Sequence, residues 1–213
     1  MGTAAGARGP GGAARPRGTA GYGEAAEALA EQYEGVTFAD VHRDVLHLFP
    51  DAPSRVVDLG AGSGRDAAAL AALGHRVVAV EPTDELRRLG ERIHAGAGVE
   101  WVDDSLPELA GVQGPFDVVL LTAVWMHLDE AERLAGMRRI LTLSAPGARV
   151  VMTLRHGPVP EGRRMWDVSA PETVELADRF GFRPLYVGAR TDLHARSGVR
   201  WTMVVLEDGR AAS

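Results

Sequence analysis

Apolar and polar positions follow two alternating rhythms along the chain. Short apolar runs of strand length are separated by segments whose apolar residues recur every three or four positions, as on one face of a helix. The runs predict strands at residues 55–60, 75–81, 99–102, 116–124, 148–155, 183–191 and 199–207. The helical spacing predicts helices at residues 64–74, 83–95, 129–144 and 171–181.

Such strand–helix alternation predicts a parallel sheet with helices on both of its faces. The last two strands are joined by a loop without a helix, so they should be antiparallel. The expected fold class is α/β: a doubly wound, mostly parallel seven-stranded sheet whose last strand is antiparallel. Two more helices are predicted ahead of the sheet, one around Ala26, Leu29, Ala30 and Tyr33 and one at about 38–49.

Composition divides the chain into three parts. Residues 1–21 are almost entirely Gly, Ala, Arg and Pro, which predicts a disordered arm. Residues 22–50 form the predicted N-terminal helical cap, and residues 51–210 form the sheet domain. The arm is either a solvated tail or a binding arm.

The overall composition limits the classes of function. The 213 residues are 46% hydrophobic and 24% charged, as in an ordinary globular domain. No apolar run reaches the length of a membrane span, and no secretory signal is recognisable, so we expect a cytoplasmic protein without a membrane partner. The absence of cysteine excludes disulfides and thiolate metal sites. A net charge of −6 disfavours a nucleic-acid substrate.

A glycine-rich segment, VVDLGAGSGRD, follows the first predicted strand. Gly60 and Gly62 fit the first two positions of the dinucleotide fingerprint G-x-G-x-x-G, but the third falls on Arg65. The spacing is instead G-x-G-x-G, ending at Gly64, with Asp58 two residues before the first glycine. The segment therefore disfavours a dehydrogenase.

This segment resembles motif I of the class I S-adenosylmethionine-dependent methyltransferases. The resemblance extends over about residues 35–207 and includes the order of elements at the end of the chain. It implies S-adenosylmethionine as methyl donor and S-adenosylhomocysteine as product. It also implies that residues 51–210 are the methyltransferase domain and that the N-terminal helices form a lid over the cofactor.

Further cofactor contacts follow from the resemblance. Glu81 ends the second strand and can accept both ribose hydroxyls, although an acid is also favoured at a helix start. The family places an acid after the third strand against the adenine amino group, where Asp104 aligns better than Asp103. The expected cofactor contacts are Tyr22, Asp58, Gly60, Ala61, Gly62, Gly64, Arg65, Glu81, Pro82, Leu86, Asp103, Asp104, Ser105, Leu106 and Thr122.

The family places the loop after the fourth strand beside the reactive methyl group. Residues 122–125 lack the Asp/Asn-Pro-Pro-aromatic signature of nucleic-acid amino methyltransferases, and residues 122–127 lack acidic metal ligands, so we expect no metal. His127 is the first candidate base, or else a helix-start residue bonded to backbone. His156, after the fifth strand, is the second catalytic candidate.

The expected substrate contacts are Trp125, Arg155 and Tyr33. Trp125 either walls the pocket or belongs to the core. Arg155 pairs either with a substrate carboxylate or phosphate, or with an acid of the protein. The loop at 157–166, which carries prolines, glycines and two arginines, is typical of a substrate loop.

The sequence thus predicts methyl transfer to an oxygen, nitrogen or carboxylate of a small molecule, an anionic one being suggested, with a role in bacterial secondary metabolism. The alternative acceptors are RNA or a peptide or protein. A non-catalytic cofactor-binding protein is a further alternative. A monomer and a homodimer both fit the sequence.

Overall fold

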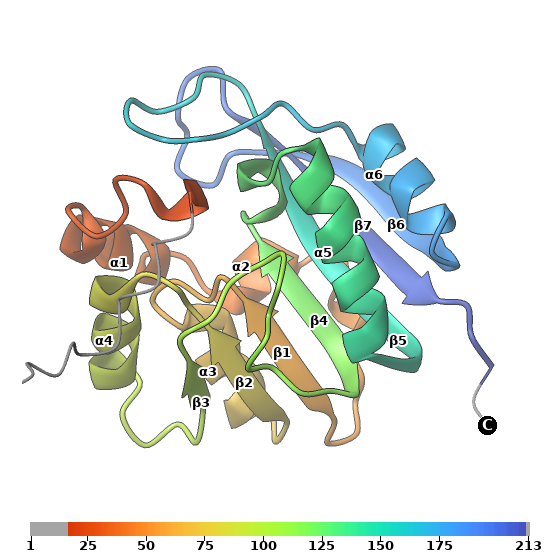
Figure 1. Ribbon diagram of the computed structural model, residues 1–213. Coiled ribbons are helices and arrows are strands. Elements are labelled where there is room, and N and C mark those ends of the chain that lie inside the picture. Colours follow the sequence, from red (N-terminus) through yellow and green to blue (C-terminus); the bar gives the residue numbers. More distant parts are fainter. Residues whose placement is uncertain (1–16, 212–213) are drawn as a thin grey trace, which may run out of the picture.

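The computed structural model of the chain describes residues 17–211. Within them a seven-stranded sheet has the order β3-β2-β1-β4-β5-β7-β6 (Figure 1). The strands are β1 (Arg55–Leu59), β2 (Arg76–Val80), β3 (Glu100–Val102), β4 (Phe116–Thr122), β5 (Ser144–His156), β6 (Phe182–Thr191) and β7 (Arg200–Asp208). Among the described strands, β7 pairs antiparallel with both β5 and β6, whereas the other pairs are parallel. The predicted fold class and the antiparallel last strand are confirmed.

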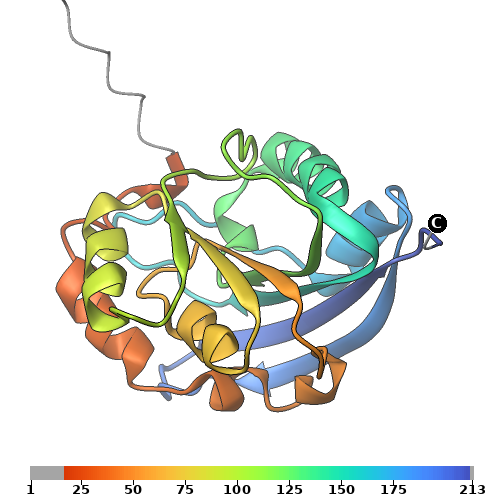
Figure 2. The same ribbon diagram turned by 90° about the horizontal axis from the view of Figure 1, so that it is seen from below.

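Helices cover both faces of this sheet, as predicted. Figure 2 shows α5 on one side of the strands and α3 on the other. Three short 3-10 helices accompany the α-helices. The helices are η1 (Arg17–Thr19), α1 (Ala26–Glu34), α2 (Phe38–His42), η2 (Leu46–Leu48), α3 (Arg65–Ala72), α4 (Asp84–Ile93), η3 (Trp125–His127), α5 (Glu130–Leu143) and α6 (Ala170–Asp178).

The core explains the apolar run of β4 from Val118 to Leu121. Val119 and Leu121 of this strand face the cluster formed with α5 and α6, whereas Val118 and Leu120 face the cluster formed with α2 and α3. A strand buried on both faces has no position left for a polar residue. The polar side chains therefore gather at the strand ends, where the sheet meets solvent.

The predicted helix at 38–49 is not continuous. After α2 the amide of Val45 bonds the carbonyl of His42, and the amide of Phe49 bonds that of Leu46. These i→i−3 bonds replace helical ones, so the segment turns tightly while Phe38, Val45 and Phe49 all remain in the core. The apolar spacing correctly marked the buried side chains, but one continuous helix was wrong.

The N-terminal region contributes to the site end of the molecule. Residues 1–16 of the predicted arm lie outside the described residues, whereas residues 17–21 form η1 and a turn. A Cβ on Gly18 would lie 3.4 Å from Cβ of His127, so this turn packs on the η3 segment. The lid role of the N-terminal helices stays a prediction. None of the helices between residues 17 and 211 has the length and hydrophobicity that a membrane crossing requires.

Candidate active site

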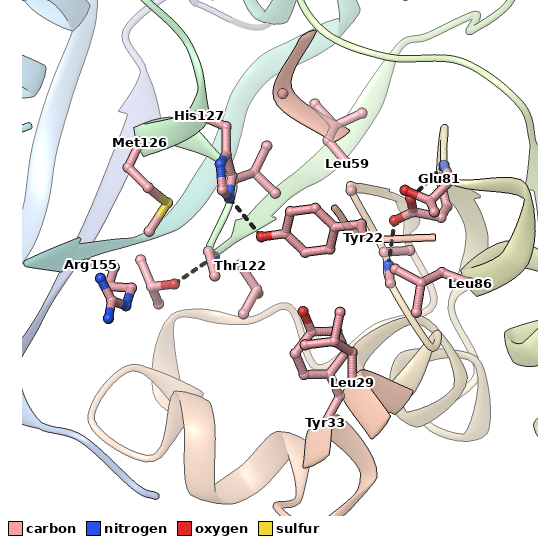
Figure 3. Close-up of a pocket in the computed structure, with 18 of the residues that line it drawn as sticks. Tyr22, Leu29, Tyr33, Leu59, Glu81, Leu86, Thr122, Met126, His127 and Arg155 are labelled. Atoms are coloured by element: carbon pink, nitrogen blue, oxygen red, sulfur yellow. Dashed lines mark hydrogen bonds between the residues drawn. The ribbon is translucent and has the colours of Figure 1, made fainter. Parts of the chain in front are cut away.

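A cavity of about 720 Å³ opens at the carboxyl ends of β1, β2, β4 and β5. Ligand pockets typically measure roughly 300–1,000 Å³, so the cavity is large enough for a nucleoside-sized molecule together with a small second one. In the close-up, Glu81 and Arg155 lie at opposite sides, with Tyr22 and Thr122 between them (Figure 3). The cavity therefore has two chemically different ends.

Most of the residues expected from the sequence line this cavity. Their positions agree with the expectation, whereas their contacts with a cofactor or substrate stay predictions. The residues that line the cavity are Tyr22, Tyr33, Asp58, Gly60, Ala61, Gly62, Arg65, Glu81, Pro82, Leu86, Ser105, Leu106, Thr122, His127 and Arg155.

Two predicted acids lie outside the cavity lining. The Asp103 side chain is 67% exposed and lies 3.2 Å from Nη2 of Arg87. The Asp104 carboxylate accepts the amides of Ser105, at 2.8 Å, and Gly111, at 2.7 Å. Asp104 thus organises its own loop, and the structure does not bring its carboxylate to the cavity.

Trp125, His156 and Gly64 also lie outside the lining. Trp125 is fully buried in the main core cluster, which is the core alternative considered for it. The ring nitrogens of His156 bond Asp167, at 2.8 Å, and Thr202, at 2.9 Å. A Cβ on Gly64 would lie 2.7 Å from the ring of Trp101, so protein packing accounts for that glycine.

Glu81 is held rigidly at one end of the cavity. Its Oε2 accepts the Gly62 amide at 2.8 Å, and its Oε1 accepts the Thr83 amide at 2.7 Å (Figure 3). Burial raises the pKa of Glu81, while these two amides oppose that rise. A carboxylate has about four lone-pair sites, so the Glu81 carboxylate can still accept from a further donor.

His127 lies near the other end and its tautomer follows from its neighbours. Nδ1 lies 2.7 Å from the carbonyl oxygen of Arg164, which can only accept, so Nδ1 carries the proton. Nε2 of the neutral ring is then an acceptor, and the Tyr22 hydroxyl donates to it at 2.9 Å. Burial and nearby arginine charges lower the pKa of His127. The ring is therefore neutral near pH 7 and can accept a proton at Nε2.

A family model described as a methyltransferase domain matches residues 56–147. That segment contains the glycine loop, Glu81 and His127, and it begins in β1. This segment is therefore similar to methyltransferase domains, and the fold is that of solved S-adenosylmethionine-dependent methyltransferases.

Known relatives of this methyltransferase act on different acceptors. It is 34% identical to the demethylmenaquinone methyltransferase of Clavibacter sepedonicus over 133 residues, which cover 60% of this chain and 54% of that protein. It is 36% identical to the protein-L-isoaspartate O-methyltransferase of Halorhodospira halophila over 134 residues, 58% of this chain and 60% of that one. The chain thus matches only a little over half of the length of these curated relatives.

The fold has a close counterpart among solved structures. The 1,6-didemethyltoxoflavin-N1-methyltransferase of Burkholderia thailandensis, solved with 1,6-didemethyltoxoflavin and S-adenosylhomocysteine, has a TM-score of 0.61 to this methyltransferase at 22% identity. The match covers 88% of this chain and 90% of that one. At this identity the likeness is one of fold.

The sequence analysis missed Asp66, a buried carboxylate of this methyltransferase's cavity lining. It accepts from Nε2 of His42, at 2.9 Å, from Nε of Arg65, at 2.7 Å, and from Oγ1 of Thr122, at 2.9 Å. Burial alone would raise the pKa of Asp66, but His42 and Arg65 hold it well below its usual range. The signal in the sequence was an acid in the first turn of a helix. Such an acid is equally well explained by its favourable interaction with the helix dipole, so it did not identify a residue of the cavity.

Other missed residues come from two segments distant in sequence. Arg163, Arg164 and Met165 reach the cavity from the loop after β5, which the sequence marked as a substrate loop. Asp192 and Arg196 reach it from the loop between β6 and β7. Among the described residues no group of three His, Cys, Asp or Glu side chains could hold a metal ion.

Proposed function

We propose that this methyltransferase moves a methyl group from S-adenosylmethionine to an oxygen, nitrogen or carboxylate of a small molecule. The observation that carries the proposal is one cavity with Glu81 at one side and His127 and Arg155 toward the other (Figure 3). The two reactants of a methyl transfer would meet between these ends. Shielding them from water and aligning them is the main task of such an enzyme.

The end with Glu81 fits the cofactor. The remaining acceptor capacity of its carboxylate suits the hydroxyls of a ribose. The apolar side chains of Leu86, Leu106 and Leu109 line the same cavity and would cover a flat base. When bound, the cofactor supplies a methyl group already activated by its sulfonium.

At the other end the chain supplies a base. An acceptor hydroxyl or amine in the position now taken by the Tyr22 hydroxyl would donate to Nε2 of His127. As a lone pair of the acceptor bonds the methyl carbon, the carbon–sulfur bond breaks and its electrons stay on sulfur. The acceptor proton passes to Nε2 of His127. A carboxylate acceptor has no proton to lose and needs only positioning.

A protein or peptide acceptor is the second candidate. It is favoured by the similarity to protein-L-isoaspartate O-methyltransferases, whose acceptor is named as a protein residue. The matches cover 60% and 48% of the length of those relatives. A role in bacterial secondary metabolism, a cytoplasmic location and the oligomeric state also stay predictions.

The test uses S-adenosylmethionine carrying an isotope-labelled methyl group. The purified protein is incubated with extract of the source organism, which is then separated into small-molecule, RNA and protein fractions. We expect the label among the small molecules, where mass spectrometry identifies the product. Label in the protein fraction would favour the second candidate. Binding of S-adenosylhomocysteine without transfer to any fraction would contradict catalysis, and binding of a nicotinamide dinucleotide instead would contradict the cofactor assignment.

A further inference from the structure

Arg155 is a buried cation that lacks an acidic partner. It is 8% exposed and lines the cavity at the end of β5. Among residues 17–211 no carboxylate oxygen lies within the 4.0 Å of an ion pair, and its printed side-chain contact is Nη1 to Sδ of Met165 at 4.0 Å. Removing a guanidinium from water without a counter-ion is costly. Arg155 would therefore be stabilised by an anion in the cavity.

Arg163 lines the same cavity and, among the described residues, likewise lacks an acidic partner. Its guanidinium carbon lies 3.5 Å from the centre of the Tyr22 ring, which fixes its orientation. Its Nη1 is buried and has no hydrogen-bond partner within the described part of the chain. Again no described carboxylate is within ion-pair distance. Stacking on the Tyr22 ring leaves the edge of the guanidinium, which carries the N–H donors, available to a ligand.

Two acids that share the cavity, Asp192 and Glu132, are already paired with other arginines. Asp192 accepts from Nε of Arg196, at 3.0 Å, and from Nη2 of Arg196, at 2.6 Å, as well as from the Trp201 indole at 2.8 Å. Glu132 lies 2.9 Å from Nη1 of Arg164. Neither acid lies within ion-pair distance of Arg155 or Arg163. Asp192 and Glu132 are thus engaged by Arg196 and Arg164, whereas Arg155 and Arg163 have no described carboxylate within ion-pair distance.

The charges of both guanidinium groups act on the same two residues, Tyr22 and His127. The charges of Arg163 and Arg155 each lower the pKa of Tyr22, against the rise caused by burial, and each lowers the pKa of His127 in addition to burial. Tyr22 and His127 are the hydrogen-bonded pair at the reacting end of the cavity. Both cations therefore line the cavity near the position proposed for the acceptor's nucleophile.

We propose that Arg155 and Arg163 together bind an anionic group of the methyl acceptor, a carboxylate or a phosphate, and so place its nucleophile beside Nε2 of His127. The inference rests on the proposed function, because it names the acceptor class of that site. Two guanidinium groups offer paired N–H donors that match the oxygens of either anion. A neutral analogue of the same shape would leave both cations desolvated and uncompensated, so it is rejected.

The test measures binding of three aromatic probes by saturation-transfer NMR titration. Benzoate and phenyl phosphate carry the two anions, and benzamide is the neutral control. Each titration is performed with the full chain, alone and loaded with S-adenosylhomocysteine. We expect at least one anion to bind at least tenfold more tightly than benzamide. The tighter of the two anions distinguishes a carboxylate acceptor from a phosphate acceptor.

Charge-removing variants locate the anion. We expect R155Q and R163Q each to weaken anion binding at least tenfold while the affinity for S-adenosylhomocysteine is unchanged. R92Q, at an exposed position in the last turn of α4, changes the net charge equally and should bind like the wild type. R155K, which keeps the charge, should retain part of the affinity if R155Q folds poorly.

Two results would overturn the inference: benzamide binding as tightly as both anions, or full anion affinity in R163Q, whose side chain lies in a loop outside the core. A chain that binds the anions but not S-adenosylhomocysteine would instead contradict the proposed function. The two failures are therefore distinguishable.

Discussion

The Tyr22 hydroxyl donates a 2.9 Å hydrogen bond to Nε2 of His127, although the two residues are 105 positions apart in the chain. The rings also meet edge to face, with centroids 5.5 Å apart. Since the Arg164 carbonyl fixes the proton on Nδ1, the Tyr22 hydroxyl marks where a proton donor meets the base. An acceptor bound for methylation would take over that position.

Replacing Glu81 tests the cofactor end. E81A removes the carboxylate and should weaken S-adenosylhomocysteine binding by about 1.5–3 kcal/mol, the range for hydrogen bonds to a charged group. Isothermal titration calorimetry measures the change. D103N is the control, because the exposed Asp103 side chain lies outside the cavity and should leave affinity unchanged. Wild-type affinity in E81A would remove Glu81 from the cofactor site.

Replacing His127 tests the base. H127A should lower kcat about 100-fold or more for an acceptor that loses a proton, because proton transfer to a positioned base contributes about that much. Its affinity for S-adenosylhomocysteine should stay unchanged. A loss of only a few fold in steady-state assays would limit His127 to positioning.

The pH profile gives an independent measurement of the same residue. His127 accepts a proton only in its neutral form, and burial lowers its pKa from the ordinary value of about 6.5. The wild-type kcat should therefore be level near neutral pH and fall only as the solution becomes more acidic than about pH 6.5. H127A should lack this acid limb, and an unchanged limb would assign it to another group.

Asp66 should be important for stability. D66N removes a charge that His42 and Arg65 balance in the buried interior, and breaking such a pair costs about 3–5 kcal/mol. Because the pKa of Asp66 is depressed in the folded state, its contribution is complete above its unfolded pKa of about 3.9 and is lost on acidification toward the folded pKa. Urea unfolding at pH 7 measures the cost, with D103N as control. Equal stability of the two variants would contradict this role.

Alanine substitutions at Gly64 and Gly74 distinguish the cost of backbone strain from the cost of a packing clash. Both have positive φ, +87° and +94°, so an alanine costs about 1–2 kcal/mol at either position. The new Cβ would lie 2.7 Å from the Trp101 ring at Gly64 but would meet nothing within 4 Å at Gly74. G64A should therefore be less stable than G74A by about a further 1–3 kcal/mol in urea unfolding. Equal losses would exclude the packing contribution.

The sequence by itself predicted the sheet, the helices on its faces and the residues that line one end of the cavity, such as Gly60 and Glu81. Those features depend on local sequence. A mostly apolar run such as residues 116–122 specifies a strand. Residues that follow parallel strands, such as Gly60 and Glu81, reach the same edge of the sheet. Local periodicity could not set the direction of each side chain at that edge. Neighbouring side chains point to opposite faces, so Arg155 enters the cavity while His156 bonds Asp167 and Thr202 outside its lining.

Only the tertiary structure decided which distant residues meet. Tyr22 reaches His127, and Arg163 stacks on Tyr22, through segments that no sequence period relates. The lack of an ion pair at Arg155 among the described residues is likewise a property of the whole fold, because Asp192, an acid of the same cavity, pairs with Arg196. Periodicity specifies what a segment buries, whereas the pairing of charges depends on packing between segments far apart in the chain.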